Sequence, residues 1–390
     1  MKFGFLSEGD PRPGQTYSQR YWDLVEEVIF ADKMGFDVFG SSEQHFAIGV
    51  ASISAPECFY PYLFAKTERI RFRHAVTLLP FMINHPLRVA ERIATQDILS
   101  RGRIELGTGR GNTMLTLRGF GVDIETTRDQ WEEGIDLIKA AFTSDPFTFE
   151  GKFFNVPPRS LIPKPIQDPY PPIFVASTGP DSLRRAAQKG LGVITSAVER
   201  GWSYVEDAIK VYRAEAAAAE ASGMHVTNAI AVNTTAHCAH TTQQAIDEAG
   251  AVIIKERKLA GDAYARLSTI SPDYAYMRDI AALGEAMESL DYLRLESGSI
   301  IIGDPEHFIE QIQKFEAMGA DEVWFRLDSL PHHMVMQSIE LIGRYVIPQF
   351  KDPRQVVQHP EVMRDKLKAK RAELARIKEQ ALAAGAPATV

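Results

Sequence analysis

Short apolar segments that alternate with helical segments are the feature that most constrains how this chain can fold. Eight segments of strand character begin near residues 2, 36, 70, 103, 173, 191, 229 and 322. Helical periodicity follows most of them, as between Pro86, near a helix start, and Gly102, just past its end. Eight such units favour a closed (β/α)8 TIM barrel over an open parallel sheet. The expected fold class is therefore α/β, a single barrel with insertions.

The barrel is expected to take up most of the chain. We predict one domain over residues 1–350 and a helical, partly disordered C-terminal extension over residues 351–390, where alanine and charged residues are frequent. The stretch 143–172 is rich in proline, and the alternation resumes directly after it. We therefore interpret this stretch as a surface excursion rather than a linker.

Charge and cysteine content narrow the classes of partner. A formal net charge of −8 gives no reason to expect nucleic acid, so small molecules are the expected ligands. Cys58 and Cys238 have no metal-ligand spacing and are expected to be buried thiols, with no metal site. No apolar stretch reaches 18 residues and no signal-peptide pattern opens the chain. We expect a soluble, cytoplasmic protein that does not contact a membrane.

A glycine-rich loop follows the fourth predicted strand. Gly107, Gly109 and Gly111 allow close backbone approach, and Arg110 among them can donate to a phosphate. Barrels place their ligands at the carboxyl ends of strands, where this loop lies. The spacing fits neither a Rossmann fingerprint nor a Walker loop. A tight turn with a surface arginine remains the structural alternative.

A second anion-binding pattern follows the fifth predicted strand. Ser177, Thr178 and Gly179 end that strand, and Pro180 and Ser182 stand in the first turn of a predicted helix. Free backbone N–H groups and hydroxyls at a helix start favour phosphate, although ordinary helix capping is the alternative. Two such patterns after consecutive strands favour one phosphate held between adjacent loops.

A pair of titratable residues ends the second predicted strand. Glu43 and His45 are two residues apart, so in an extended segment they face the same side, toward the barrel mouth. The histidine could act as acid, base or hydrogen-bond donor near neutral pH. A purely structural histidine is the alternative, and a metal site is disfavoured because no third ligand accompanies the pair.

The third predicted strand ends in an apolar stretch, which suits a flat ring beside a phosphate site. We expect Phe5, Phe46 and Phe81 as walls of the mouth, although core packing explains most aromatic residues of a barrel. Arg326, at the end of the eighth strand, is a further candidate for the rim.

Several motifs in order resemble the bacterial luciferase-like flavin-dependent monooxygenases. They are "MKFGF", "EQHF", "LLPFMINHPLRVAERIATQDILSRGRIELGTGRG", "VASTGPDSLRRAAQKG" and "GDPEHFIEQIQKFEAMGADEVWFRLD". The resemblance covers residues 1–350 and is most specific over residues 85–111. It implies a (β/α)8 barrel that takes reduced FMN as a diffusible co-substrate, lets O2 add at the flavin C4a, and oxygenates a small organic substrate with the hydroperoxide. A separate NAD(P)H:flavin reductase and a homo-oligomer are implied as well.

The resemblance also implies roles for individual residues. Arg110 matches the arginine that binds the FMN phosphate, and the adjacent Gly109 and Gly111 supply bare backbone. The phosphate loop and helix start of the family correspond to Ser177, Thr178, Gly179 and Ser182. Ala75 and Val76 match a site under the flavin ring where the family often has a cis peptide. Gln44 replaces a histidine that the luciferases use as base, which leaves His45 and Glu43 as the candidate catalytic residues.

Three other functions are alternatives to the flavin-dependent monooxygenase. An F420-dependent hydride-transfer enzyme shares the barrel and needs no oxygen. A phosphate-binding lyase or isomerase would carry a lysine or a carboxylate pair at the strand ends, which the sequence does not clearly offer. A flavin-binding barrel without turnover is the third, because Gln44 replaces the family histidine.

Overall fold

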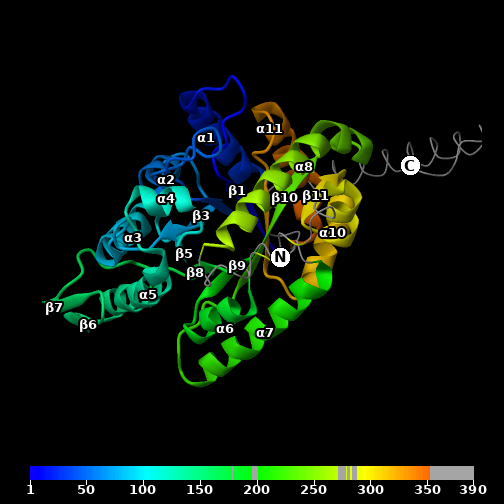
Figure 1. The fold of residues 1–390 in the computed structure, drawn as a ribbon. Helices are drawn as coiled ribbons and strands as arrows, with labels where there is room; N and C mark the ends of the chain where they lie inside the picture. Colours follow the sequence, from blue (N-terminus) through cyan, green and yellow to red (C-terminus); the bar gives the residue numbers. More distant parts are fainter. Residues whose placement is uncertain (178, 196–200, 271–277, 279–281, 283–287, 352–390) are drawn as a thin grey trace, which may run out of the picture.

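A closed barrel of parallel strands forms the centre of the molecule (Figure 1). The computed structural model describes residues 1–177, 179–195, 201–270, 278, 282 and 288–351. The barrel strands are β1 (Lys2–Ser7), β2 (Val38–Ser41), β3 (Arg71–His74), β5 (Ile104–Gly109), β8 (Ile173–Ala176), β9 (Gly192–Thr195), β10 (Ile230–Cys238) and β12 (Glu322–Arg326). Each pairs in parallel with the next in this order, and β12 pairs with β1 to close the ring. The predicted TIM barrel and its eight strands are confirmed.

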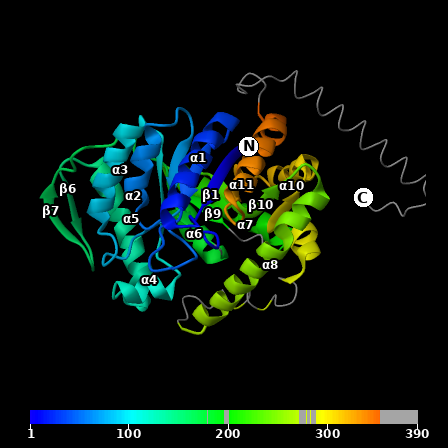
Figure 2. The ribbon, with the colours of Figure 1, turned by 90° about the horizontal axis from the view of Figure 1, so that it is seen from above.

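Helices surround the barrel, as the view from above shows (Figure 2). They are α1 (Tyr17–Met34), α2 (Pro56–Phe64), α3 (Pro86–Ser100), α4 (Met114–Gly119), α5 (Thr127–Thr143), α6 (Pro180–Gln188), α7 (Trp202–Ala221), α8 (Thr242–Leu267), α10 (Pro305–Ala317) and α11 (His332–Leu341). Shorter helical turns are η1 (Ile124–Thr126), η5 (Tyr292–Glu296), η6 (Ile342–Val346) and η7 (Ile347–Gln349). Local signals set their ends: Thr16 and Gln19 form a capping box at α1, and the imidazole of His85 caps α3.

Large side chains and an ion network fill the lower barrel interior. A Cβ atom built at Gly4 or Gly40 would lie 2.4 Å from the indole ring of Trp324, so glycine makes room for this ring. Below it the fully buried Arg73 donates to Glu105 from Nε, at 2.7 Å, and to Glu322 from Nη2, at 3.0 Å. The guanidinium also lies over the Phe174 ring. The opposite, carboxyl-terminal end is the one at which such barrels bind their ligands.

The main apolar core lies between the strands and the helices. Along α5, Trp131, Ile135, Ile138 and Phe142 share the buried face that the sequence predicts. Phe5 belongs to this outer core, with its ring centroid 5.4 Å from that of Phe39. The prediction that Phe5 lines the barrel mouth is therefore wrong. In the register of β1 it occupies an outward position between two inward ones.

Additional strands extend the barrel. The proline-rich stretch 143–172 contains an antiparallel hairpin of β6 (Phe147–Glu150) and β7 (Asn155–Arg159), which projects from the barrel in Figure 1. Two more short strands join the sheet: β4 (Thr77–Leu78), inside the stretch predicted as the third strand, pairs with β5, and β11 (Ile300–Gly303), which the sequence did not predict, pairs with β10.

The predictions for the two cysteines, the C-terminal extension and membrane-spanning segments have different outcomes. Cys238 is buried, but Cys58 is exposed, so the prediction of two buried thiols is wrong for Cys58. The predicted extension 351–390 lies outside the described residues except for Lys351. Within the part of the chain that the structure describes, none of the helices has the length and apolarity to cross a membrane.

Candidate active site at the barrel mouth

The inward-facing residues at the carboxyl end of the barrel differ in size from one side to the other. Leu6 of β1 and Arg326 of β12 lie level with each other. Across the barrel, Ala75 follows β3, Gly109 ends β5 and Ala176 ends β8, so these three positions carry at most a methyl group, with Val76 as the larger neighbour of Gly109. Ala176 is exposed although it ends a barrel strand. The inward positions at the ends of β3, β5 and β8 are therefore small.

Glu43 holds His45 at the end of β2. The Glu43 carboxylate is buried and lies with Oε1 2.9 Å from His45 Nε2. Oε1 also accepts from Asn84 Nδ2 at 2.8 Å, and Oε2 accepts from the Leu78 backbone N–H at 3.1 Å. A neutral His45 that donates from Nε2 keeps Nδ1 as its acceptor atom. The predicted proximity of Glu43 and His45 is present, and Glu43 fixes the orientation of the ring.

Aromatic contacts hold the same segment from the side of α4. The His45 ring lies edge-on to Phe120, with centroids 4.9 Å apart. Phe46 has a φ of 63°, which is unusual for a large side chain, and its centroid lies 5.3 Å from that of Phe120. Gly119 leaves room for Phe46, because a Cβ at Gly119 would approach that ring to 2.4 Å. Phe46 is thus more than half exposed at the mouth yet anchored on one side.

Backbone approaches backbone closely where β3 meets β5. The Ala75–Val76 peptide bond is cis, and the Ala75 N–H donates to the Ser41 carbonyl at 2.9 Å. A Cβ at Gly107 would lie 1.9 Å from the His74 carbonyl oxygen, and one at Gly109 would lie 2.7 Å from Val76 Cγ2. These glycines are therefore required by the contact of the two strands.

The loop after β5 leads from Gly109 into α4. Gly111 has a φ of 85°, in the left-handed region that favours glycine. Arg110 is half-buried in this loop, beside the end of β5. The loop also approaches α4, because a Cβ at Gly111 would lie 3.1 Å from Leu117 Cδ2. The predicted loop residues therefore stand at the mouth.

Hydroxyl groups gather at the start of α6, after β8. Pro180 is the first helical residue, as the sequence predicts, and Gly179 is the N-cap residue. The Oγ atoms of Ser177 and Ser182 lie 2.5 Å apart, and Ser182 Oγ accepts from the Gly179 N–H at 3.2 Å. Thr178, the remaining predicted member, lies outside the described residues. This helix start offers hydroxyls and backbone N–H groups to an anion.

Strand order brings the predicted site residues onto one rim. β5 pairs in parallel with β8, and Thr108 lies opposite Val175, so the Arg110 loop and the Ser177 turn leave neighbouring strands at the same level. Hydrogen bonds from Leu78 and Asn84 to Glu43 join the rim to β2. The candidate residues thus occupy one arc, from β2 through β3 and β5 to β8.

A charged cluster on the other side of the mouth was missed by the sequence analysis, apart from Arg326. Arg326 donates to Asp10, and from Nε to Asp328 at 3.2 Å. Burial, together with the charge of Asp328, raises the pKa of Asp10 to about 8. Burial opposes ionisation of Asp328 too, but the charges of Arg326 and Arg20 hold the pKa of Asp328 below its ordinary value. The i, i+2 spacing of Arg326 and Asp328 after a strand was the available signal.

The proteins of similar sequence align with this chain over different fractions of its length. The oxygenase component of flavin-dependent trigonelline monooxygenase from Acinetobacter baylyi is 25% identical over 358 residues, which is 89% of this chain and 95% of that protein. The uncharacterized protein y4wF of Sinorhizobium fredii is 32% identical over 193 residues. That match spans 50% of this chain and 55% of the relative, about half the length of each.

Solved structures share the fold at lower identity. The oxygenating constituent of 3,6-diketocamphane monooxygenase from Pseudomonas putida, in complex with FMN, has a TM-score of 0.67 at 24% identity, over 90% of this chain and 99% of that chain. An F420-dependent secondary alcohol dehydrogenase, in complex with an F420–acetone adduct, has a TM-score of 0.68 at 20% identity, with the same coverage. The family described as luciferase-like monooxygenase matches residues 1–322, and the chain belongs to this family.

Proposed function

We propose that this protein is a monooxygenase that uses reduced FMN and O2 to oxygenate a small organic substrate at the barrel mouth. The observation that carries the proposal is the adjacency of the Arg110 loop and the start of α6, after the paired strands β5 and β8. A guanidinium, serine hydroxyls and helix N–H groups are the donors that a phosphate monoester requires. We assign the FMN phosphate to this pair of loops.

The residues present also fit a flat ring. Ala75, Gly109 and Ala176 carry at most a methyl group, and a larger residue at position 109 would collide with Val76. A ring lying over the Ala75–Val76 backbone would therefore meet backbone and small groups. When bound, reduced flavin supplies the electrons that activate O2. Phe46, anchored on Phe120, restricts access of water from the β2 side.

His45 is the candidate for proton handling. Its Nε2 is paired with Glu43, so Nδ1 is the atom that would accept or deliver a proton in the mouth. Glu43 acts through His45: its other hydrogen bonds, to Leu78 and Asn84, fix the carboxylate and thereby the imidazole. The side chain of Gln44 is an amide, which is not basic, so Gln44 cannot serve as the base that the luciferases place at this position. Its backbone N–H donates to the Ile53 carbonyl.

The proposal includes a source of reduced flavin. The relative from Acinetobacter baylyi is named an oxygenase component, which supports a separate NAD(P)H:flavin reductase as a partner of this chain. A homo-oligomer and a cytoplasmic location belong to the same proposal, as does the division into a barrel over residues 1–350 and an extension.

Binding of FMN and riboflavin to the same variants tests the phosphate site. The two flavins share the ring and differ in the phosphate, so Arg110→Ala and Ser182→Ala should weaken FMN binding about tenfold or more and change riboflavin binding little. Arg118→Ala is the matched control, because Arg118 is an exposed arginine of α4 close in sequence to the same loop. Equal affinity of the wild-type protein for FMN and riboflavin would refute the phosphate assignment.

Two further measurements separate the other functions. Tighter binding of F420 than of FMN would favour hydride transfer, since F420-dependent enzymes share this fold. Reduced FMN mixed with the protein and O2 should be reoxidised with kinetics that differ from those of free flavin, as followed by flavin absorbance. Binding without any change in the reaction with O2 would instead favour a carrier.

A further inference from the structure

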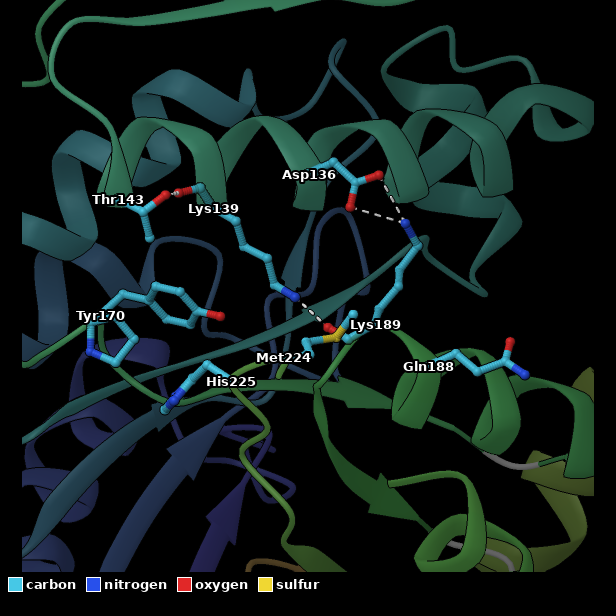
Figure 3. A pocket seen from close by; sticks show the side chains of 9 residues that line it. Asp136, Lys139, Thr143, Tyr170, Gln188, Lys189, Met224 and His225 are labelled. Atoms are coloured by element: carbon cyan, nitrogen blue, oxygen red, sulfur yellow. Dashed lines mark hydrogen bonds and ion pairs between the residues drawn. The ribbon is translucent and has the colours of Figure 1, made fainter. Parts of the chain in front are cut away.

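A cavity of about 520 Å³ lies at the end of the barrel opposite the mouth (Figure 3). Its lining comes from segments that precede three neighbouring strands: Tyr170 precedes β8, Lys189 precedes β9, and Met224 and His225 precede β10. The rest of the lining comes from α5, the end of α6 and the segment before β8: Asp136, Lys139, Thr143, Gln188 and Pro169. Because catalytic loops of such barrels lie at the carboxyl ends of strands, this cavity is separate from the proposed active site.

The walls of this cavity are mainly apolar and aromatic. The Tyr170 and His225 rings meet nearly at a right angle, 84°, with centroids 5.3 Å apart, and form a corner. The exposed thioether of Met224 lies beside them. Such a corner fits an aromatic ring edge-on to one wall and flat on the other. The volume falls in the range of small-molecule sites.

Among the charged groups that line the cavity, Asp136, Lys139 and Lys189, the amino group of Lys139 is the one that faces the aromatic corner. Figure 3 shows this side chain extending from α5 into the space beside Tyr170 and Met224, where Nζ donates to the Lys189 carbonyl. Asp136 is bonded through both oxygens to Lys189 Nζ, at 2.9 and 3.0 Å. Among the described residues Lys139 has no carboxylate within ion-pair distance. A half-buried ammonium without such a partner favours an anionic ligand.

We propose that this cavity binds a small aromatic carboxylate, with its ring in the Tyr170–His225 corner and its carboxylate on Lys139 Nζ. The ligand supplies the carboxylate that Lys139 lacks, and the ring covers the apolar walls. Neither contact involves the barrel mouth, so the site is independent of the flavin. A bound acid would lie between α5, the end of α6 and the segment before β10.

Protonation of Lys139 gives the site a characteristic pH dependence. Burial, opposed by Asp136 and reinforced by the charge of Lys189, lowers the pKa of Lys139 to about 8. Tyr170 and His225 are the other titratable groups that line the cavity, and burial raises the pKa of Tyr170. The carboxylate binds the ammonium form, so affinity falls as the pH rises through about 8, by about tenfold per pH unit above it.

Benzoate, with benzamide as its uncharged counterpart, tests the site by calorimetry. We expect benzoate to bind at least tenfold more tightly than benzamide, Lys139→Met to remove this preference, and Lys139→Arg to retain most of it. Lys210→Met is the control, because Lys210 is an exposed lysine of α7 outside the cavity lining; it should change benzoate affinity less than threefold. Saturating FMN should leave benzoate binding unchanged.

Two outcomes would overturn the site. One is equal binding of benzoate and benzamide by the wild-type protein, and the other is benzoate binding that Lys139→Met leaves intact. If Lys139→Met does not fold, Met224→Glu replaces it, because Met224 is exposed and a carboxylate there repels the ligand. Undiminished benzoate affinity in Met224→Glu would likewise refute the site. The benzoate measurements on the wild-type protein and its variants use no flavin, so their failure leaves the monooxygenase proposal untouched.

Discussion

His45 Nε2 lies 2.9 Å from Glu43 Oε1, and Glu43 in turn accepts hydrogen bonds from Leu78 and Asn84. The glutamate thus joins the end of β2 to the segment after β3 as well as orienting the imidazole. Removal of a buried carboxylate that accepts from three donors lowers the free energy of unfolding, because each donor loses its partner without gaining a hydrogen bond to water.

Glu43→Ala tests this joining role. We expect the free energy of unfolding to fall by about 1–3 kcal/mol, since the buried Leu78 N–H and Asn84 amide lose their acceptor. His45→Ala should cost less, because it removes one of the three donors. Urea denaturation measures both, with Glu316→Ala on the exposed face of α10 as control, expected within about 0.5 kcal/mol of wild type. A Glu43→Ala protein as stable as the control would contradict the role.

Gly107→Ala tests the contact between β3 and β5. The new methyl group would lie 1.9 Å from the His74 carbonyl oxygen, so the two backbones would have to separate. We expect a loss of at least about 3 kcal/mol in the free energy of unfolding, or failure to fold. Gly261→Ala, in α8 with no atom within 4 Å of the new methyl group, should be neutral or slightly stabilising. Similar stability of the two variants would contradict the requirement for glycine at position 107.

Arg73→Met tests the ion network inside the barrel. The substitution leaves Glu105 and Glu322 buried without their shared cation, and we expect a loss of about 3–5 kcal/mol in chemical denaturation. The charges of Arg73 and Arg71, working against burial, lower the pKa of Glu105 to about 2. Its contribution to stability is therefore present above its ordinary pKa and lost as the pH falls toward 2.

A triple variant checks that burial of unpaired charge is the cause. Arg73→Met combined with Glu105→Gln and Glu322→Gln removes all three charges, so it should be more stable than Arg73→Met alone. If the triple variant is the less stable protein, the loss in Arg73→Met arises from packing against Phe174 and Trp324 instead.

Asp10→Asn tests the charged cluster at the mouth. The folded state holds the Asp10 proton up to about pH 8, whereas the unfolded chain releases it near pH 3.8. Between these values the unfolded chain binds fewer protons, so this group makes stability fall as the pH rises. Asp10→Asn should flatten the stability profile between about pH 5 and pH 8, by up to about 1.4 kcal/mol per pH unit. Asp207→Asn, on the exposed side of α7, should keep the wild-type slope.

The local pattern of apolar and polar residues predicts most of the fold. Most barrel strands lie in short stretches with apolar residues, and their helices are marked by periodicity and by caps such as His85 with Pro86, so all eight strands could be predicted from the sequence. The four residues of β11 were missed, although β2, β3, β8 and β9 are equally short; β11 stands outside the closed ring of eight strands. Its place in the sheet depends on pairing with the far half of β10.

In the candidate site, too, some features were predictable from the sequence and others depend on tertiary structure. Sequence alone placed Glu43 beside His45 and the Arg110 loop after a strand, because residues two apart and strand ends are local features. That Asn84 and Leu78 bind Glu43, that Asp10 meets Arg326, and that Phe5 points away from the mouth were decided by tertiary structure. These contacts depend on strand register and loop path, which fix where residues distant in sequence meet and leave no periodic trace in the chain.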